Sequence, residues 1–301
     1  MKIAVLGATG TIGRALVALL AKQHDVLAVS RRPQEATSGI RWAAADASDG
    51  AAVHKVLEGV DVAYYLVHSL GSPDFEQRDR LAAETVAREA DRAGLRQLVY
   101  LGGLGDDSPE LSRHLRSRAE TADALASRSV PLTTLRAAMV IGAGSAAFET
   151  IVALVDRLPA MICPRWVSTQ TQPIALADIA AYLAAAAGRK DMLGRSFDAG
   201  GPDVITYREM IERIARIRGR RPLIVEVPVI TPRLSSYWLH LVTPVNAGIA
   251  RPLIEGLRNA TVARDERLRR LVPLPLTPFE DAVRAAISAT RSHGRATAST
   301  N

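Results

Sequence analysis

The chain has 301 residues, of which 48% are hydrophobic and 23% charged, so it can bury a large core and is not a largely disordered protein. Its formal net charge is +7, and 34 of its 38 basic residues are arginines. These arginines alternate with acidic residues along segments such as 74–92, which predicts a solvated helical face. Because no nucleic-acid motif accompanies the charge, we expect no nucleic-acid partner.

One cysteine, Cys163, excludes an internal disulfide, and no Cys/His spacing is typical of zinc, so we expect no metal. The first apolar run, Ile3 to Leu6, is too short for a secretory signal. No apolar stretch reaches the roughly 18 residues of a membrane-spanning helix. These features predict a protein of the reducing cytoplasm.

Short apolar runs alternate with longer helical patterns through the first half of the chain. The predicted strands are 2–6, 25–30, 40–43, 61–67, 97–101 and 131–141. The predicted helices between them are 12–22, 50–58, 74–93 and 112–128. Several strands are almost continuously hydrophobic, as burial on both faces requires. The pattern predicts an α/β fold with a doubly wound parallel sheet of the Rossmann type.

After Gly142 the pattern is looser. It predicts helices over 146–158, 176–187 and 207–218 and strands over 196–199 and 223–229. We predict a Rossmann domain over 1–200 and a flexible tail over 291–301. Between them, residues 201–290 are expected to form a smaller substrate-facing lobe at the carboxyl ends of the strands, where open α/β sheets bind ligands.

The first predicted strand leads directly into a glycine-rich loop, residues 7–13, and a helix follows. In this context Gly7 permits the tight turn, Gly10 lets backbone amides approach a pyrophosphate, and Gly13 lets the helix pack on the strand. We therefore predict a nicotinamide dinucleotide site. Its predicted pyrophosphate contacts are Gly7, Thr9, Gly10, Thr11, Ile12 and Gly13.

The second and third strands indicate which nucleotide is bound. Ser30, Arg31 and Arg32 stand where an NAD site usually has an acidic residue, and guanidinium groups suit a ribose 2′-phosphate. This favours NADP(H), with NAD(H) possible if the arginines are only solvated loop charges. Asp46 and Ala47 follow the third strand, where Asp46 either bonds the adenine amino group or caps the next helix.

With these motifs, residues 1–201 resemble the short-chain dehydrogenase/reductase superfamily, in its atypical and extended branch of NmrA-like and epimerase-like proteins. The resemblance is carried by the glycine loop and by segments 98–101, 112–120, 135–142 and 172–180. It implies an NAD(P)H-dependent oxidoreductase. A non-catalytic NADP(H)-binding sensor or assembly protein and a sugar-nucleotide epimerase are the alternatives.

Active members of this superfamily carry Tyr-x-x-x-Lys in the helix after the fifth strand. The resemblance places His114 at the Tyr position and Arg118 at the Lys position, with Gly102 and Gly103 where a Ser or Thr is expected. His114 titrates near neutrality and is the candidate proton donor, with a surface histidine as the alternative. Arg118 keeps its proton, so it is expected to bind the ribose and to lower the pKa of His114.

Two residues at the end of the fourth strand, Val67 and His68, are expected to contact the cofactor near the nicotinamide. Tyr64 and Tyr65 lie inside that strand, and core packing is the better interpretation for at least one of them. Cys163 is expected to be an unreactive, half-buried thiol.

The segment 234–250 is uncharged and rich in apolar residues. Three interpretations fit it: a lid over a hydrophobic substrate, an oligomer contact, or a helix lying in a membrane interface. The lid is favoured, and it implies a small apolar carbonyl or enone as substrate.

Overall fold

A computed structural model describes residues 1–35, 40–69, 72, 74–105, 111–227 and 258–298. The segment 234–250, interpreted above as a lid, lies outside the described residues.

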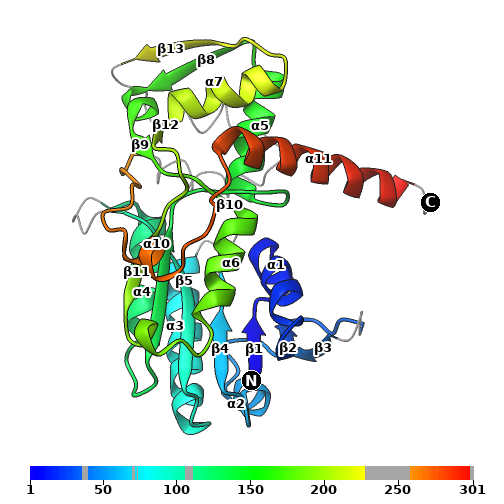
Figure 1. The fold of residues 1–301 in the computed structure, drawn as a ribbon, viewed down its shortest axis with the longest axis vertical. Coiled ribbons are helices and arrows are strands. Elements are labelled where there is room, and N and C mark those ends of the chain that lie inside the picture. The colour runs from blue at the N-terminus through cyan, green and yellow to red at the C-terminus, as the bar shows by residue number, and fades with distance from the viewer. Residues whose placement is uncertain (36–39, 70–71, 73, 106–110, 228–257, 299–301) are drawn as a thin grey trace.

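The fold is built on a seven-stranded parallel sheet with the strand order β11-β6-β5-β4-β1-β2-β3 (Figure 1). Its strands are β1 (Lys2–Leu6), β2 (Asp25–Ser30), β3 (Arg41–Ala44), β4 (Val62–Tyr65), β5 (Gln97–Gly103), β6 (Leu132–Ala137) and β11 (Ser196–Ala199). β1 pairs with both β2 and β4, so the order of the strands reverses there and a crevice opens at their carboxyl ends. The predicted doubly wound parallel sheet is confirmed.

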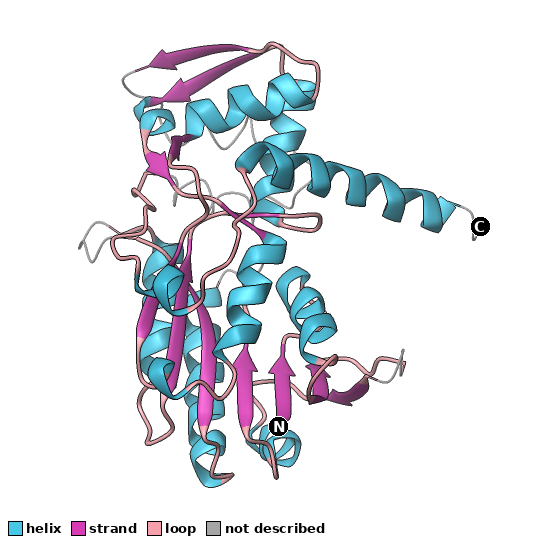
Figure 2. Ribbon diagram, viewed as in Figure 1, coloured by secondary structure: helices cyan, strands magenta, loops and turns pink. Residues whose placement is uncertain are grey.

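Helices cover both faces of this sheet (Figure 2). They are α1 (Thr11–Leu20), α2 (Gly50–Leu57), α3 (Phe75–Arg92), α4 (Arg113–Leu125) and α6 (Leu176–Ala186). Side chains of β1 alternate between two cores, since Ile3 and Val5 pack with α1 and α6 whereas Ala4 and Leu6 pack with α2, α3 and α4. Burial on both faces explains why the strands are so hydrophobic. Tyr64 and Tyr65 are both fully buried, one in each core.

A smaller lobe stands above the carboxyl ends of the strands (Figure 1). It contains α5 (Ala146–Arg157), β8 (Ala160–Pro164), α7 (Tyr207–Ile217), β13 (Leu223–Val227) and the first part of α11 (Phe279–Ala298). β8 and β13 pair in parallel and share a third apolar core with α5, α7 and α11. This lobe therefore draws on residues before 200 as well as on residues 201–290.

Shorter elements join the two parts of the molecule. They are β7 (Val140–Ile141), β9 (Gln170–Thr171), β10 (Ile174–Ala175), β12 (Ile205–Thr206), α10 (Arg267–Leu271) and the 3-10 turns η1 (Arg165–Ser168) and η2 (Lys190–Met192). The strand predicted over 131–141 is two strands, because β7 leaves the main sheet and pairs with β10. Helix α11 continues to Ala298, through much of the stretch assigned to a tail.

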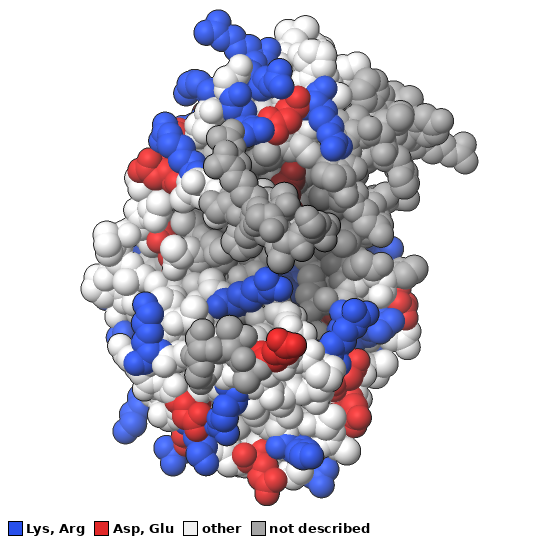
Figure 3. Space-filling view, turned by 90° about the vertical axis from the view of Figure 1, so that its right-hand side faces the viewer, with Lys and Arg blue, Asp and Glu red and all other residues white. Residues whose placement is uncertain are grey.

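Helix α3 has the solvated face predicted for 74–92, on which its arginines are exposed, but two of its acidic residues do not lie on that face. Asp79 and Glu89 are each only 2% exposed, so two of its acidic side chains face the interior. On the face of the molecule drawn in Figure 3, basic and acidic side chains are interspersed over the described residues. No helix among the described residues is both long enough and apolar enough to cross a bilayer.

Candidate cofactor and substrate site

The glycine loop packs too tightly for side chains at two of its positions. Gly7 has φ +86°, and a Cβ there would lie 2.6 Å from the Leu66 carbonyl oxygen at the end of β4. A Cβ on Gly13 would lie 2.4 Å from the Gly7 carbonyl oxygen. Gly10 is different, because a Cβ there would meet one atom alone within 4 Å, the Gly7 oxygen at 3.3 Å, among the described residues.

The N-terminus of α1 offers hydrogen-bond donors at this loop. Gly10 is the N-cap and supplies no side-chain acceptor, so the first backbone N–H groups of the helix have no acceptor within it. Two side chains brace the loop: the Thr11 hydroxyl donates to the Gly144 carbonyl (2.7 Å), and Arg14 Nε donates to the Thr9 carbonyl (2.8 Å). A close-packed loop with glycines at its three key positions, and with N–H groups at a helix N-terminus, fits a dinucleotide pyrophosphate.

The end of β2 presents the two arginines at the surface. Arg31 and Arg32 are exposed, whereas Ser30 is 6% exposed and its hydroxyl donates to the Arg32 carbonyl oxygen (2.6 Å). This bond orders the backbone that carries both guanidinium groups. Ala47 is buried in the second core.

Asp46 forms a turn rather than the helix cap. Its Oδ1 accepts from the backbone N–H and the hydroxyl of Ser48, and Asp49 is the N-cap of α2. The hydrogen bonds from Ser48 hold the pKa of Asp46 below its ordinary value, and Arg31 and Arg78 lower it further. The carboxylate thus lies within the electrostatic influence of Arg31, just after β2, and of Arg78 on α3.

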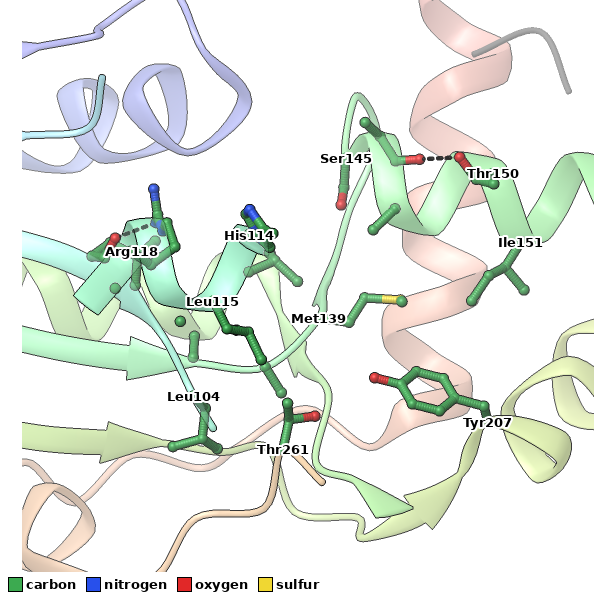
Figure 4. A pocket seen from close by; sticks show the side chains of 18 of the residues that line it. Leu104, His114, Leu115, Arg118, Met139, Ser145, Thr150, Ile151, Tyr207 and Thr261 are labelled. Atoms are coloured by element: carbon green, nitrogen blue, oxygen red, sulfur yellow. Dashed lines mark hydrogen bonds between the residues drawn. The ribbon is translucent and has the colours of Figure 1, made fainter. Parts of the chain in front are cut away.

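A cavity of about 350 Å³ lies between the carboxyl ends of β5 and β6 and the smaller lobe (Figure 4). It extends from Ile12 of the glycine loop to Tyr207 of α7 and Thr261. Most of its wall is apolar: Leu101, Leu104, Leu115, Met139, Val140, Ile151, Leu154 and Trp166. Gly103 makes room for this wall, because a Cβ there would lie 2.9 Å from Leu115 Cδ2.

His114 and Arg118 lie one turn apart on α4 and both line the cavity (Figure 4). The Arg118 guanidinium donates to the Leu101 carbonyl oxygen at the end of β5 and lies 5.2 Å from the centre of the Tyr100 ring. Arg118 is therefore held in place by the sheet.

The imidazole of His114 faces the cavity rather than the outer surface. Its Nδ1 is buried, with no hydrogen-bond partner among the described residues. Burial holds the pKa of His114 well below its ordinary value of 6.5, and His68 and Arg118 lower it further. The ring is thus neutral at physiological pH, and Arg118 shifts the pKa in the expected direction, although burial has the larger effect.

His68 follows β4 and lies against His114, with ring centres 5.3 Å apart. Its Nδ1 is 2.5 Å from Oδ2 of Asp79, whose Oδ1 accepts from the backbone N–H of Ser69 (2.8 Å). Burial lowers the pKa of His68, and the hydrogen bond to Asp79 opposes that shift. Val67 packs in part against the second core.

Asp79 was not among the residues predicted for the site. The helical periodicity of α3 places Asp79 on its buried face. The residues that recur on this face, all buried, are Phe75, Asp79, Ala83 and Val86. An acid at a core position of a helix needs a partner, which here is His68.

Cys163 belongs to the third core, and burial raises the pKa of its thiol.

Comparison with known proteins agrees with this geometry. Residues 7–189, more than half of the chain, match the model of the NAD(P)H-binding family. A (4-alkanoyl-5-oxo-2,5-dihydrofuran-3-yl)methyl phosphate reductase of Streptomyces griseus is 27% identical, over 93% of this chain and 95% of that protein. The mitochondrial NADH dehydrogenase (ubiquinone) 1 alpha subcomplex subunit 9 of Arabidopsis thaliana is 26% identical, over 74% of this chain and 60% of that protein.

Among solved structures, the triphenylmethane reductase of Citrobacter sp., complexed with NADP(H), superposes with a TM-score of 0.75 at 17% identity. That match covers 95% of this chain and 100% of the other. The same fold therefore extends over nearly the whole chain. The chain belongs to the NAD(P)H-binding family.

Proposed function

We propose that this protein is an NADPH-dependent reductase of a small apolar carbonyl or enone compound. The observation that carries the proposal is the cavity, which joins Ile12 of the glycine loop to an apolar wall in the smaller lobe and has two histidines on its edge. Apolar pockets with a few convergent polar groups are typical of small-molecule sites. When bound, the nicotinamide cofactor supplies the two electrons and the hydrogen of the reduction.

The chain's own residues would bind and orient the two ligands. The backbone of the loop 7–13 would hold the pyrophosphate, and Arg31 and Arg32 would bind the 2′-phosphate. The preference for NADPH over NADH rests on these exposed guanidinium groups and agrees with the NADP(H) bound to the structural neighbour.

His114 would bind the carbonyl oxygen of the substrate. A neutral imidazole on the cavity wall donates its N–H to that oxygen and polarises the carbonyl group. Arg118 favours this neutral form by its charge, and its own bond to the Leu101 carbonyl keeps it from moving into the cavity.

The name of the Streptomyces relative supports the substrate class, because that enzyme reduces a compound with an alkanoyl group on an oxo-dihydrofuran ring. An alkyl chain of this kind matches an apolar wall such as that formed by Leu115, Met139 and Ile151.

The experiment is a series of enones with alkyl chains of increasing length, with the oxidation of NADPH measured for each. Each buried CH₂ contributes about 0.8 kcal/mol, so kcat/KM should rise about fourfold per carbon until the cavity is full. Leu115→Gln should flatten this dependence, whereas the matched control Leu81→Gln, at a side chain that is 47% exposed on α3, should not. No NADPH oxidation with any member of the series would refute the proposal.

A non-catalytic role is the second candidate, and the similarity to the Arabidopsis NADH dehydrogenase subunit favours it. A protein of this kind would bind NADPH tightly and oxidise none of it. The cytoplasmic location and the absence of a nucleic-acid partner stay predictions from the sequence.

A further inference from the structure

The carboxyl group of Asp79 is buried and makes two hydrogen bonds of different kinds. Asp79 is 2% exposed and lies on α3, facing the loop that follows β4. One of its oxygens accepts from the Ser69 backbone N–H (2.8 Å), and the other is 2.5 Å from Nδ1 of His68. Since a backbone N–H can only donate, the first contact fixes which oxygen remains for the histidine.

This arrangement selects one tautomer of His68. A carboxylate oxygen accepts, so Nδ1 of His68 carries the ring proton and Nε2 has a free lone pair. That Nε2 is buried and has no partner within the described part of the chain. An acceptor in such a place costs free energy unless a ligand donates to it.

The neighbouring rings keep His68 in this position. Phe75 packs edge-on against it with ring centres 6.4 Å apart, and His114 lies on it at 5.3 Å. Nδ1 of His114 is likewise buried without a partner among the described residues. His68 and His114 both line the cavity.

We infer that Asp79 is a positioning residue that fixes His68 as a hydrogen-bond acceptor, so that His68 and His114 together bind a hydroxyl group of the ligand. The hydroxyl donates to Nε2 of His68, and its oxygen accepts the N–H of His114. A carbonyl compound gains such a hydroxyl when it is reduced, so the pair recognises the alcohol form of the substrate. Only this last step rests on the proposed reductase function.

The first test is the tautomer of His68 in the wild-type protein without cofactor, measured by ¹⁵N NMR of the histidine rings. A His68→Gln variant identifies the signals by their absence. We expect a proton on Nδ1 and a bare Nε2. A proton on Nε2, or a doubly protonated ring at pH 7, would overturn the inference.

The second test is Asp79→Asn. Its single side-chain oxygen must accept from Ser69, so its amide NH₂ faces Nδ1 of His68 and the ring proton moves to Nε2. The matched control is Glu89→Gln, because Glu89 is also 2% exposed on α3 and its carboxylate lies 3.5 Å from Nδ1 of His54, on the α2 side. Asp79→Asn should invert the tautomer of His68, and Glu89→Gln should leave it unchanged.

The third test uses 2-octanol as a hydroxyl probe and 2-octanone as its carbonyl partner, with binding followed by the His68 signals. In Asp79→Asn the affinity for 2-octanol should fall about tenfold, as loss of one hydrogen bond predicts, while that for 2-octanone changes little. Equal changes for both probes would refute the hydroxyl site. If the probe binds as predicted but NADPH is never oxidised, the reductase function fails and the role of Asp79 stands.

Discussion

Alanine substitutions at Gly10 and Gly13 should separate folding from cofactor binding. Gly13 is inside the first turn of α1, and its added Cβ would lie 2.4 Å from the Gly7 carbonyl oxygen and 2.8 Å from Ala8 Cα. Both are backbone atoms, so the helix or the loop must shift. Gly10 has φ −70° and ψ 165°, which alanine adopts without strain, and its Cβ would approach the Gly7 oxygen at 3.3 Å.

The two substitutions should therefore differ in their effects on stability and on NADPH binding. Overpacking of this severity costs about 3 kcal/mol, and the better helix propensity of alanine offsets about 1 kcal/mol, so Gly13→Ala should lose about 2 kcal/mol of the free energy of unfolding. The midpoint of thermal unfolding should fall by about 3 °C. Gly10→Ala should keep its stability within about 1 kcal/mol. Loss of one charge-assisted hydrogen bond to the pyrophosphate should weaken NADPH binding about 10- to 100-fold.

Thermal unfolding without cofactor measures the loss of stability, and titration calorimetry with NADPH measures the loss of affinity for the cofactor. Gly94→Ala is a control that measures the cost of a positive φ without a steric clash. Gly94 has φ +68°, and no atom of the described residues lies within 4 Å of an added Cβ. If Gly10→Ala binds NADPH as tightly as the wild type, the glycine loop is not where the pyrophosphate binds.

Three further predictions concern other parts of the molecule. Arg31→Ala should weaken NADPH binding about 10- to 100-fold and NADH binding little, and equal losses in calorimetry would contradict the preference for NADPH. Asp198→Asn should cost about 3–5 kcal/mol in urea unfolding, because the Asp198 side chain is 0% exposed and lies 2.7 Å from Arg136, and a loss below 1 kcal/mol would refute this estimate. Stability should fall below pH 6.5 by up to about 1.4 kcal/mol per pH unit, since burial depresses the folded-state pKa of His114 and the unfolded chain takes up the proton first. His114→Gln should show a smaller fall between about pH 6.5 and 5.5 in the same unfolding assay, and an identical fall would exclude His114 as the cause.

The central sheet was predictable because local pattern and tertiary environment agree there. The strands of β1, β2 and β4 are apolar on both faces, and the glycine loop marks the turn after β1. The smaller lobe was less predictable. β8 pairs with β13, about sixty residues away in the chain, and exposed positions of both strands carry apolar residues, Ile162 and Leu223, so their burial pattern is not visible in the sequence.

The candidate site shows the same division between local and long-range signals. Residues of the loop 7–13 have roles set by local backbone geometry, so the sequence indicated them. The partnership of His68 with Asp79 joins a loop to the buried side of a charged helix, and the arginines around Asp79 obscured its core position. The cavity itself depends on how α4, α5 and α7 pack, which no local pattern specifies.

The central claim is that the loop 7–13 and the apolar cavity serve one reduction. Its most direct test is incubation with NADPH deuterated at C4 of the nicotinamide and an enone with a medium-length alkyl chain, followed by mass spectrometry of the product. The deuterium should be transferred to the product, and Leu115→Gln should reduce this transfer. Tight binding of NADPH with no labelled product from any enone or ketone would contradict it.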